Sequence, residues 1–153
     1  MNTVDTRDRE QVIAEIQSAL GDRLLTLERP SATRVFLEVD SQHIVDTASI
    51  FSQELQARLQ TASAVDAPRK IEVLYHWSFD SAGLVVTVRT RIDRDQPEIA
   101  SITPTCPAAH WIEREMWELM GVSFQGHPDM RHLLLQDDWP AGKFPLRRDY
   151  RRE

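Results

Sequence analysis

The residues best suited to chemistry are two glutamates in a charged, apolar-rich run. Glu115 and Glu118 lie three positions apart, so a helix over 109–120 places both carboxylates on one face. Positioned carboxylates serve as general acids and bases. One hypothesis is therefore a small enzyme that uses Glu115, Glu118 and His127 as acid/base groups. We favour the competing interpretation, in which both glutamates are surface or interface carboxylates satisfied by arginines, because no nucleophile motif accompanies them.

Three histidines raise the question of a metal site. His110, His127 and His132 could gather with Glu115 around an ion, but the sequence contains neither HExxH nor HxH. The GHPD run at 126–129 is typical of a turn, because glycine allows unusual backbone angles, proline stiffens the chain and aspartate bonds the local backbone. We therefore expect no metal ligands in this chain.

Cofactor binding also lacks a sequence signal. Cys106 is the single cysteine, which excludes a disulfide within the chain. An iron–sulfur cluster or a thiolate zinc site needs several thiolates, so this chain alone is not expected to hold one. We expect Cys106 to act as a small buried apolar group. The sequence contains no GxGxxG, GxxxxGK[ST] or GxSxG motif, so nucleotide binding and α/β-hydrolase chemistry are not indicated.

Charge is unevenly distributed along the 153 residues. The formal net charge is −6, yet the stretch from Lys143 onward carries +3, which leaves −9 on the rest. An acidic body argues against nucleic acid as the main partner. The basic end could meet phosphate, anionic lipid or an acidic protein surface. A polyanion-binding adaptor that works through residues 143–152 is therefore a third hypothesis.

The elements that position these groups follow from hydrophobic periodicity and turn residues. Helices are predicted over 6–20, 44–60 and 109–120, the last ended by Gly121. Strands are predicted over 23–27, 34–40, 71–77, 84–92 and 99–102. Residues 62–68 are expected to connect two elements, and Ser81–Gly83 to form the turn of a hairpin.

This order predicts an α+β fold, in which helices pack on a small, largely antiparallel or mixed sheet. One domain is expected, with 1–108 forming the α+β body and 109–153 forming a helix and an irregular, proline-rich, basic C-terminal extension. Ile112, Met116, Leu119 and Met120 form the stripe of the 109–120 helix that should face the sheet. Three of the four tryptophans lie within 110–150, which favours a shaped contact surface.

Four blocks of this region resemble a known family in order and spacing. They are Glu113-Arg114-Glu115, Gly121-Val122, Gly126-His127-Pro128-Asp129 with Arg131, and Pro145-Leu146-Arg147-Arg148-Asp149-Tyr150. The blocks are similar to those of the 30-kDa subunit of respiratory complex I, also called its C subunit. That family includes the equivalent subunit of membrane-bound, energy-converting nickel–iron hydrogenases.

The resemblance implies a non-catalytic subunit in the hydrophilic arm of an NADH–quinone oxidoreductase or an energy-converting hydrogenase. Such a subunit binds no cofactor and braces the large, hydrogenase-like subunit beside the small iron–sulfur subunit during electron transfer. Iron–sulfur clusters, with nickel–iron or flavin centres, would belong to those partners. No apolar stretch approaches the ~20 residues that span a bilayer. The N-terminus lacks the apolar region of a signal peptide. These absences favour a cytoplasmic position, and the resemblance implies that the chain is peripheral to the inner face of the cell membrane.

The resemblance also assigns residues to the contact with partner subunits. Those expected at the interface are Glu113, Arg114, Glu115, Trp117, His127, Asp129, Arg131, Arg147, Arg148 and Asp149, the last four in an extended end that wraps the large subunit. Two positions depart from the family, since members often have Asp at Glu118 and an aromatic residue at Met120. The DDWP run at 137–140 and the end at Glu153 are more typical of the hydrogenase branch.

Overall fold

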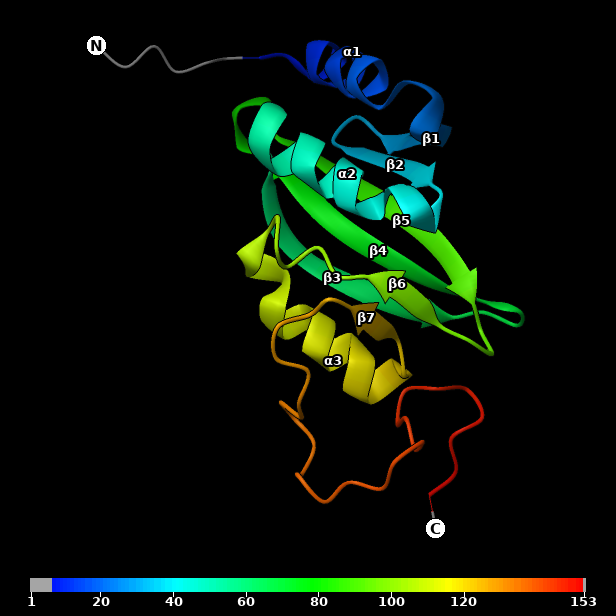
Figure 1. Ribbon diagram of the computed structural model, residues 1–153. Helices are drawn as coiled ribbons and strands as arrows, with labels where there is room; N and C mark the ends of the chain where they lie inside the picture. The colour runs from blue at the N-terminus through cyan, green and yellow to red at the C-terminus, as the bar shows by residue number, and fades with distance from the viewer. Residues whose placement is uncertain (1–6, 153) are drawn as a thin grey trace.

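The computed structural model describes residues 7–152 and begins with helix α1, Arg9–Leu20 (Figure 1). The side chain of Asp8 accepts a hydrogen bond from the Gln11 N–H and caps the helix, which is why the helix starts after it. Its apolar residues Val12, Ile13, Ile16 and Leu20 recur at helical spacing and are buried, and Gly21 ends the helix with φ +53°. The first residues of the predicted 6–20 helix reach into the N-terminal part outside the described residues.

Five strands form the main sheet: β1 Leu24–Ser31, β2 Arg34–Val39, β3 Arg58–Asp66, β4 Lys70–Phe79 and β5 Leu84–Asp93. Their spatial order is β1-β2-β5-β4-β3. Strands β3, β4 and β5 form an antiparallel meander, and β1 pairs antiparallel with β2. Strand β2 pairs parallel with β5, so the sheet is mixed. The predicted α+β class, with helices packed on a mixed sheet, is confirmed.

The hairpin between β4 and β5 is the element that the sequence predicts most directly. A short 3-10 turn, Asp80–Ala82, leads into Gly83, whose φ of +58° is the left-handed conformation that glycine tolerates. Along β4, side chains alternate between the two faces of the sheet. Tyr75 and Trp77 are buried on the helix-covered face, where Phe51 packs against Trp77 at a ring-centroid distance of 5.5 Å.

The opposite face of the sheet carries charged side chains instead of helices. Glu38 of β2 lies between two arginines of β5, bonding Arg89 at 3.0 Å and Arg91 at 2.6 Å. Arg91 also pairs with Glu72 of β4 at 3.0 Å. Because one face is apolar and the other carries this cross-strand ladder, the register of the sheet is strongly specified.

The predicted helix over 44–60 is too long. Helix α2 covers Ile44–Ser49, continues as one π-helical turn over Ile50–Glu54, and the chain then turns at Gln56 with φ +55°. The predicted connection over 62–68 is wrong as well, because most of it belongs to β3. Small side chains such as Ala62 and Ser63 carry little strand signal, and pairing along β4 decides their conformation.

The predicted strand over 99–102 exists but does not extend the main sheet. Strand β6, Glu98–Ala100, pairs parallel with β7, Ser123–Gln125, in a separate two-stranded sheet. A parallel pair needs a crossover, which here contains helix α3, His110–Met120. The helix packs against β3, and residues 126–152 continue past it without helix or strand (Figure 1).

Candidate docking surface on α3 and the C-terminal segment

Glu113 lies inside the protein. Its side chain has no exposed surface, and its carboxylate accepts hydrogen bonds from the Tyr75 hydroxyl at 3.0 Å and the Ile102 N–H at 2.9 Å. The hydroxyls of Ser101 and Thr103 also donate to it. Burial, and the neighbouring carboxylate, raise the pKa of Tyr75. Glu113 therefore joins α3 to β4 and to the 101–103 turn.

Arg114 is also buried, with 6% of its surface exposed. Its Nε donates to the carbonyl oxygen of Arg131 at 2.9 Å, and one terminal nitrogen donates to that of His132 at 2.6 Å. A guanidinium fits this task because its donors form a fixed planar fork. The bonds tie the loop after the GHPD turn to the middle of α3.

Glu118 lies one turn after Arg114 on α3 and forms hydrogen bonds with the same loop. Its buried carboxylate accepts N–H donors from Leu133, Leu134 and Leu135 at 3.0, 2.7 and 3.3 Å, and lies 3.1 Å from His132 Nδ1. Burial opposes ionisation of the carboxyl, but these donors outweigh it and hold the pKa below its ordinary value. Glu118 is buried and is satisfied by backbone N–H groups and His132, so the prediction of a surface carboxylate with an arginine partner is wrong, while the interface alternative stays a prediction.

The groups of the acid/base hypothesis lie in three different places. Glu115 lines a cavity of about 130 Å³ between α3 and β3. Glu118 lines another of about 270 Å³, beside Trp117 and Trp139. His127 lies at the start of α3, where its Nε2 is 2.9 Å from the His110 carbonyl oxygen. Neither cavity is lined by all three residues, and the Glu118 carboxylate is already occupied by its own donors, so the geometry gives no support to this enzyme.

The histidines are used in packing. The rings of His110 and His127 lie 4.8 Å apart, and His132 lies 5.1 Å from the ring of Trp117. Across residues 7–152, no three His, Cys, Asp or Glu side chains are arranged to hold a metal ion. Cys106 is buried, and burial raises the pKa of its thiol. Asp129, in the predicted turn, pairs with exposed Arg131 at 3.0 Å.

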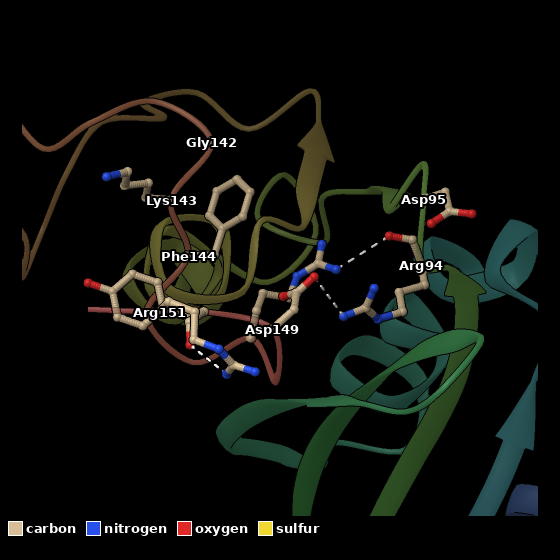
Figure 2. A pocket seen from close by; sticks show the side chains of 9 residues that line it. Arg94, Asp95, Gly142, Lys143, Phe144, Asp149 and Arg151 are labelled. Carbon is tan, nitrogen blue, oxygen red and sulfur yellow. Dashed lines mark hydrogen bonds and ion pairs between the residues drawn. The ribbon is translucent and has the colours of Figure 1, made fainter. Parts of the chain in front are cut away.

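The C-terminal segment is docked on the body of its own chain. The Phe144 ring contacts Gly121, and four polar contacts follow along the segment. They are Leu146 N–H to the Leu119 oxygen, Arg147 Nε to the Met120 oxygen, Arg148 N–H to the Asp66 carboxylate and Asp149 to Arg94. The basic blocks of the sequence thus meet the ends of α3, β3 and β5. A basic cavity of about 510 Å³ lies where the segment passes Arg94 (Figure 2).

Three large apolar side chains are exposed around these elements. Trp111 is 68% exposed, Leu134 64% and Leu146 60%. Trp111 was part of the predicted contact surface, whereas sequence reasoning missed both leucines. A signal existed for Leu134, because three consecutive leucines in a loop cannot all point into a core. Of the three, Leu134 is the strongest candidate for contact with another protein, because buried Arg114 and Glu118 fix the backbone of its loop while its side chain stays exposed.

Comparison with known sequences assigns the chain to a protein family. Residues 37–153 match the sequence model of the family described as "Respiratory-chain NADH dehydrogenase, 30 Kd subunit". The chain is therefore a member of this 30-kDa subunit family, as its four sequence blocks predicted. Within residues 7–152, no helix combines the length and apolar character needed to cross a bilayer.

The similar proteins are subunits of several kinds of membrane complex. The C subunit of the F420H2 dehydrogenase of Methanosarcina mazei is 31% identical over 94% of this chain and 92% of its own length. Hydrogenase-4 component G of Escherichia coli is 30% identical over 97% of this chain, but this chain spans only 28% of it. A chain of the membrane-bound sulfane sulfur reductase, an archaeal respiratory membrane complex, superposes with a TM-score of 0.82 at 26% identity, covering 93% of this chain and 85% of that one.

Proposed function

We propose that this chain is a non-catalytic subunit in the hydrophilic arm of a membrane-bound oxidoreductase, where it braces the large, hydrogenase-like subunit beside the small iron–sulfur subunit. The observation that carries the proposal is the 131–135 loop. Buried Arg114 and Glu118 hold its backbone, and Leu134 projects from it into solvent. A loop ordered before binding loses little conformational entropy on docking, which favours tight assembly.

The relatives support a close association with a large subunit. Two of them are named as combined C/D subunits of NADH-quinone oxidoreductase, and this chain matches segments covering 17% and 13% of their length. Formate hydrogenlyase subunit 5 of Escherichia coli is 48% identical over 64 residues, which make up 11% of that protein. A segment similar to this chain is thus carried within larger chains of oxidoreductases. In these relatives one polypeptide contains both parts. We infer that this separate chain binds non-covalently to the corresponding part of a large subunit.

In this proposal the redox centres belong to the partners. The iron–sulfur clusters, and any nickel–iron or flavin centre, would be held by other subunits, and this chain would bring no cofactor of its own. The assembled complex would transfer electrons as an NADH–quinone oxidoreductase or an energy-converting hydrogenase. The chain would lie peripherally on the cytoplasmic side of the cell membrane, attached only through the complex.

The test is recovery of the chain from its native cells with an affinity tag, under mild detergent, followed by mass spectrometry. We expect a large hydrogenase-like subunit and a small iron–sulfur subunit in stoichiometric amounts. Leu134→Asp should reduce their recovery on the order of tenfold, because a charge cannot enter an apolar contact without loss of binding. Recovery of the unmodified chain only as a free monomer would overturn the proposal.

A matched control is Leu25→Asp. Leu25 is 58% exposed on β1, at the opposite edge of the sheet from α3. The same chemical change there should leave recovery of the partners unaltered. Equal loss of partners in both variants would show a general defect of the protein instead of a docking surface around Leu134.

A further inference from the structure

The cavity beside Arg94 is lined mainly by charged side chains. It lies between the turn after β5 and the C-terminal segment and has a volume of about 510 Å³ (Figure 2). Four cationic side chains line it, against two acidic ones. They are Arg94, Lys143, Arg147 and Arg151, with Asp95 and Asp149. The lining therefore carries an excess of positive charge in a chain whose net charge is −6.

The positive charges of this cavity are unequally compensated. Arg94 is neutralised by Asp66, whose carboxylate it meets at 2.6 Å, and it reaches Asp149 at 3.4 Å. Arg147 donates to the backbone oxygens of Met120 and Arg94, which carry no formal charge. No carboxylate within residues 7–152 forms an ion pair with Arg147 or Arg151.

The surroundings of Arg147 favour an anion with an apolar stem. Its guanidinium lies 5.7 Å from the centre of the Phe144 ring, which forms one wall of the cavity together with Tyr150. A half-buried guanidinium is incompletely hydrated, and a carboxylate can bond such a group more strongly than water does. The methylene groups of an aspartate or glutamate would lie against the ring.

The basic region continues onto the neighbouring surface, so it is larger than the site of a single ion. A second cavity, of about 560 Å³, shares Arg94 and Asp95 with the first and is also lined by Arg69, Lys70 and Asp93, so its lining keeps one net positive charge. Two adjoining basic cavities fit successive acidic side chains better than one isolated anion. The charge pattern is complementary to an acidic stretch of protein.

We propose that the cavity receives a carboxylate side chain from an acidic segment of a partner subunit; this inference rests on the function proposed above. Arg147 and Arg151 bind the carboxylate, and Phe144 packs against its methylene groups. The contact lies at the C-terminal segment and is distinct from the apolar contact around Leu134. It adds charge complementarity, which guides association and fixes orientation.

Lys143 allows a direct test, because the chain has only two lysines, Lys70 and Lys143. A carbodiimide without a spacer arm joins a carboxylate to an amine only when the two are in contact. Treatment of the isolated native complex should join Lys143 to an aspartate or glutamate of a partner peptide, identified by mass spectrometry. Lys143→Arg keeps the charge and should abolish this product without loss of partner subunits. A complex that is fully assembled but yields no such product overturns the inference.

Charge reversal provides the second measurement. Arg151→Glu should lower recovery of the partner on the order of tenfold at low salt, and Arg152→Glu, an exposed neighbour outside the cavity lining, should change it little. Equal recovery in both variants counts against the inference.

If the unmodified chain recovers no partner, the proposed function itself fails. If inorganic pyrophosphate binds the isolated chain and Arg151→Glu removes that binding, with no Lys143 product in the complex, the cavity is a site for a free oxyanion and the inference is overturned.

Discussion

The ring of Phe144 lies so close to Gly121 that a Cβ atom added to the glycine would be 2.6 Å from the ring. Gly121 also ends α3 in the left-handed conformation, with φ +74°. One glycine therefore both stops the helix and receives the C-terminal segment. This contact and the polar contacts of residues 146–149 together hold the segment on the body of the protein.

Gly121→Ala should be markedly more destabilising than Gly126→Ala. Both glycines have positive φ, +74° and +80°, but a Cβ at Gly126 meets nothing within 4 Å. We expect Gly126→Ala to cost about 1 kcal/mol in the free energy of unfolding from backbone strain. Gly121→Ala should cost about 1–3 kcal/mol more, because Phe144 must move. Urea denaturation measures both, and equal losses would show that the ring contact contributes nothing.

Arg114→Ala should destabilise the isolated chain by about 2–4 kcal/mol. The substitution removes two charge-assisted hydrogen bonds and leaves the carbonyl oxygens of Arg131 and His132 without these donors. Arg131→Ala is the control, because the Arg131 side chain is 74% exposed and its ion pair with Asp129 is worth little. Thermal denaturation of the two variants compares them. A change in assembly with no change in stability would assign Arg114 to the interface instead.

The stability of the chain should fall at acid pH partly through Glu118. Its folded-state pKa is lowered, so ionised Glu118 stabilises the fold above the unfolded-state pKa, and this contribution is lost as pH falls through the folded-state pKa. The free energy of unfolding should therefore decrease below about pH 4.5. Glu118→Gln should be less stable at pH 7 and should show a shallower decrease. Parallel pH profiles for the two proteins would contradict this role.

Asp66→Asn should release the C-terminal segment. The Asp66 side chain is 2% exposed, pairs with Arg94 and accepts the Arg148 N–H at 2.9 Å. Trypsin cleavage after Arg147 or Arg148 should become several-fold faster, because proteolysis follows the population of the locally open state. Asp93→Asn is the matched control, since Asp93 ends β5 with its side chain 58% exposed. Unchanged cleavage after Asp66→Asn would show that the other contacts suffice to hold the segment.

The parts of the fold that could be predicted are those encoded by local sequence. The β4–β5 hairpin has its turn residues at 81–83, and α3 has an apolar stripe followed by Gly121, so each is specified within about a dozen residues. Strand β3 could not be recognised, because Ala62, Ser63 and Ala64 become a strand only through pairing with β4. Because β3 begins at Arg58, the helix before it ends earlier than the predicted 44–60 range.

The sequence directs attention to α3 and the C-terminal segment but does not predict which of their charged side chains are buried. Residue type places a glutamate at the surface, yet Glu113 lies three positions before buried Met116 and shares its face of α3. The donors that satisfy Glu118 are backbone N–H groups of 133–135, which any sequence would supply. Only the folded arrangement shows that these groups converge on one carboxylate. The interface role expected for the exposed residues remains a prediction.

The parallel pairing of β2 with β5 has a kinetic consequence. Arg34 lies opposite Val85, about fifty positions away in the sequence, whereas β3, β4 and β5 are joined in succession. Closing such a long loop costs chain entropy before any strand contact compensates for it. We expect the β3–β4–β5 meander to form the folding nucleus, with α1, β1 and β2 joining after the transition state. Truncation of buried Val35 should then accelerate unfolding while leaving the refolding rate nearly constant.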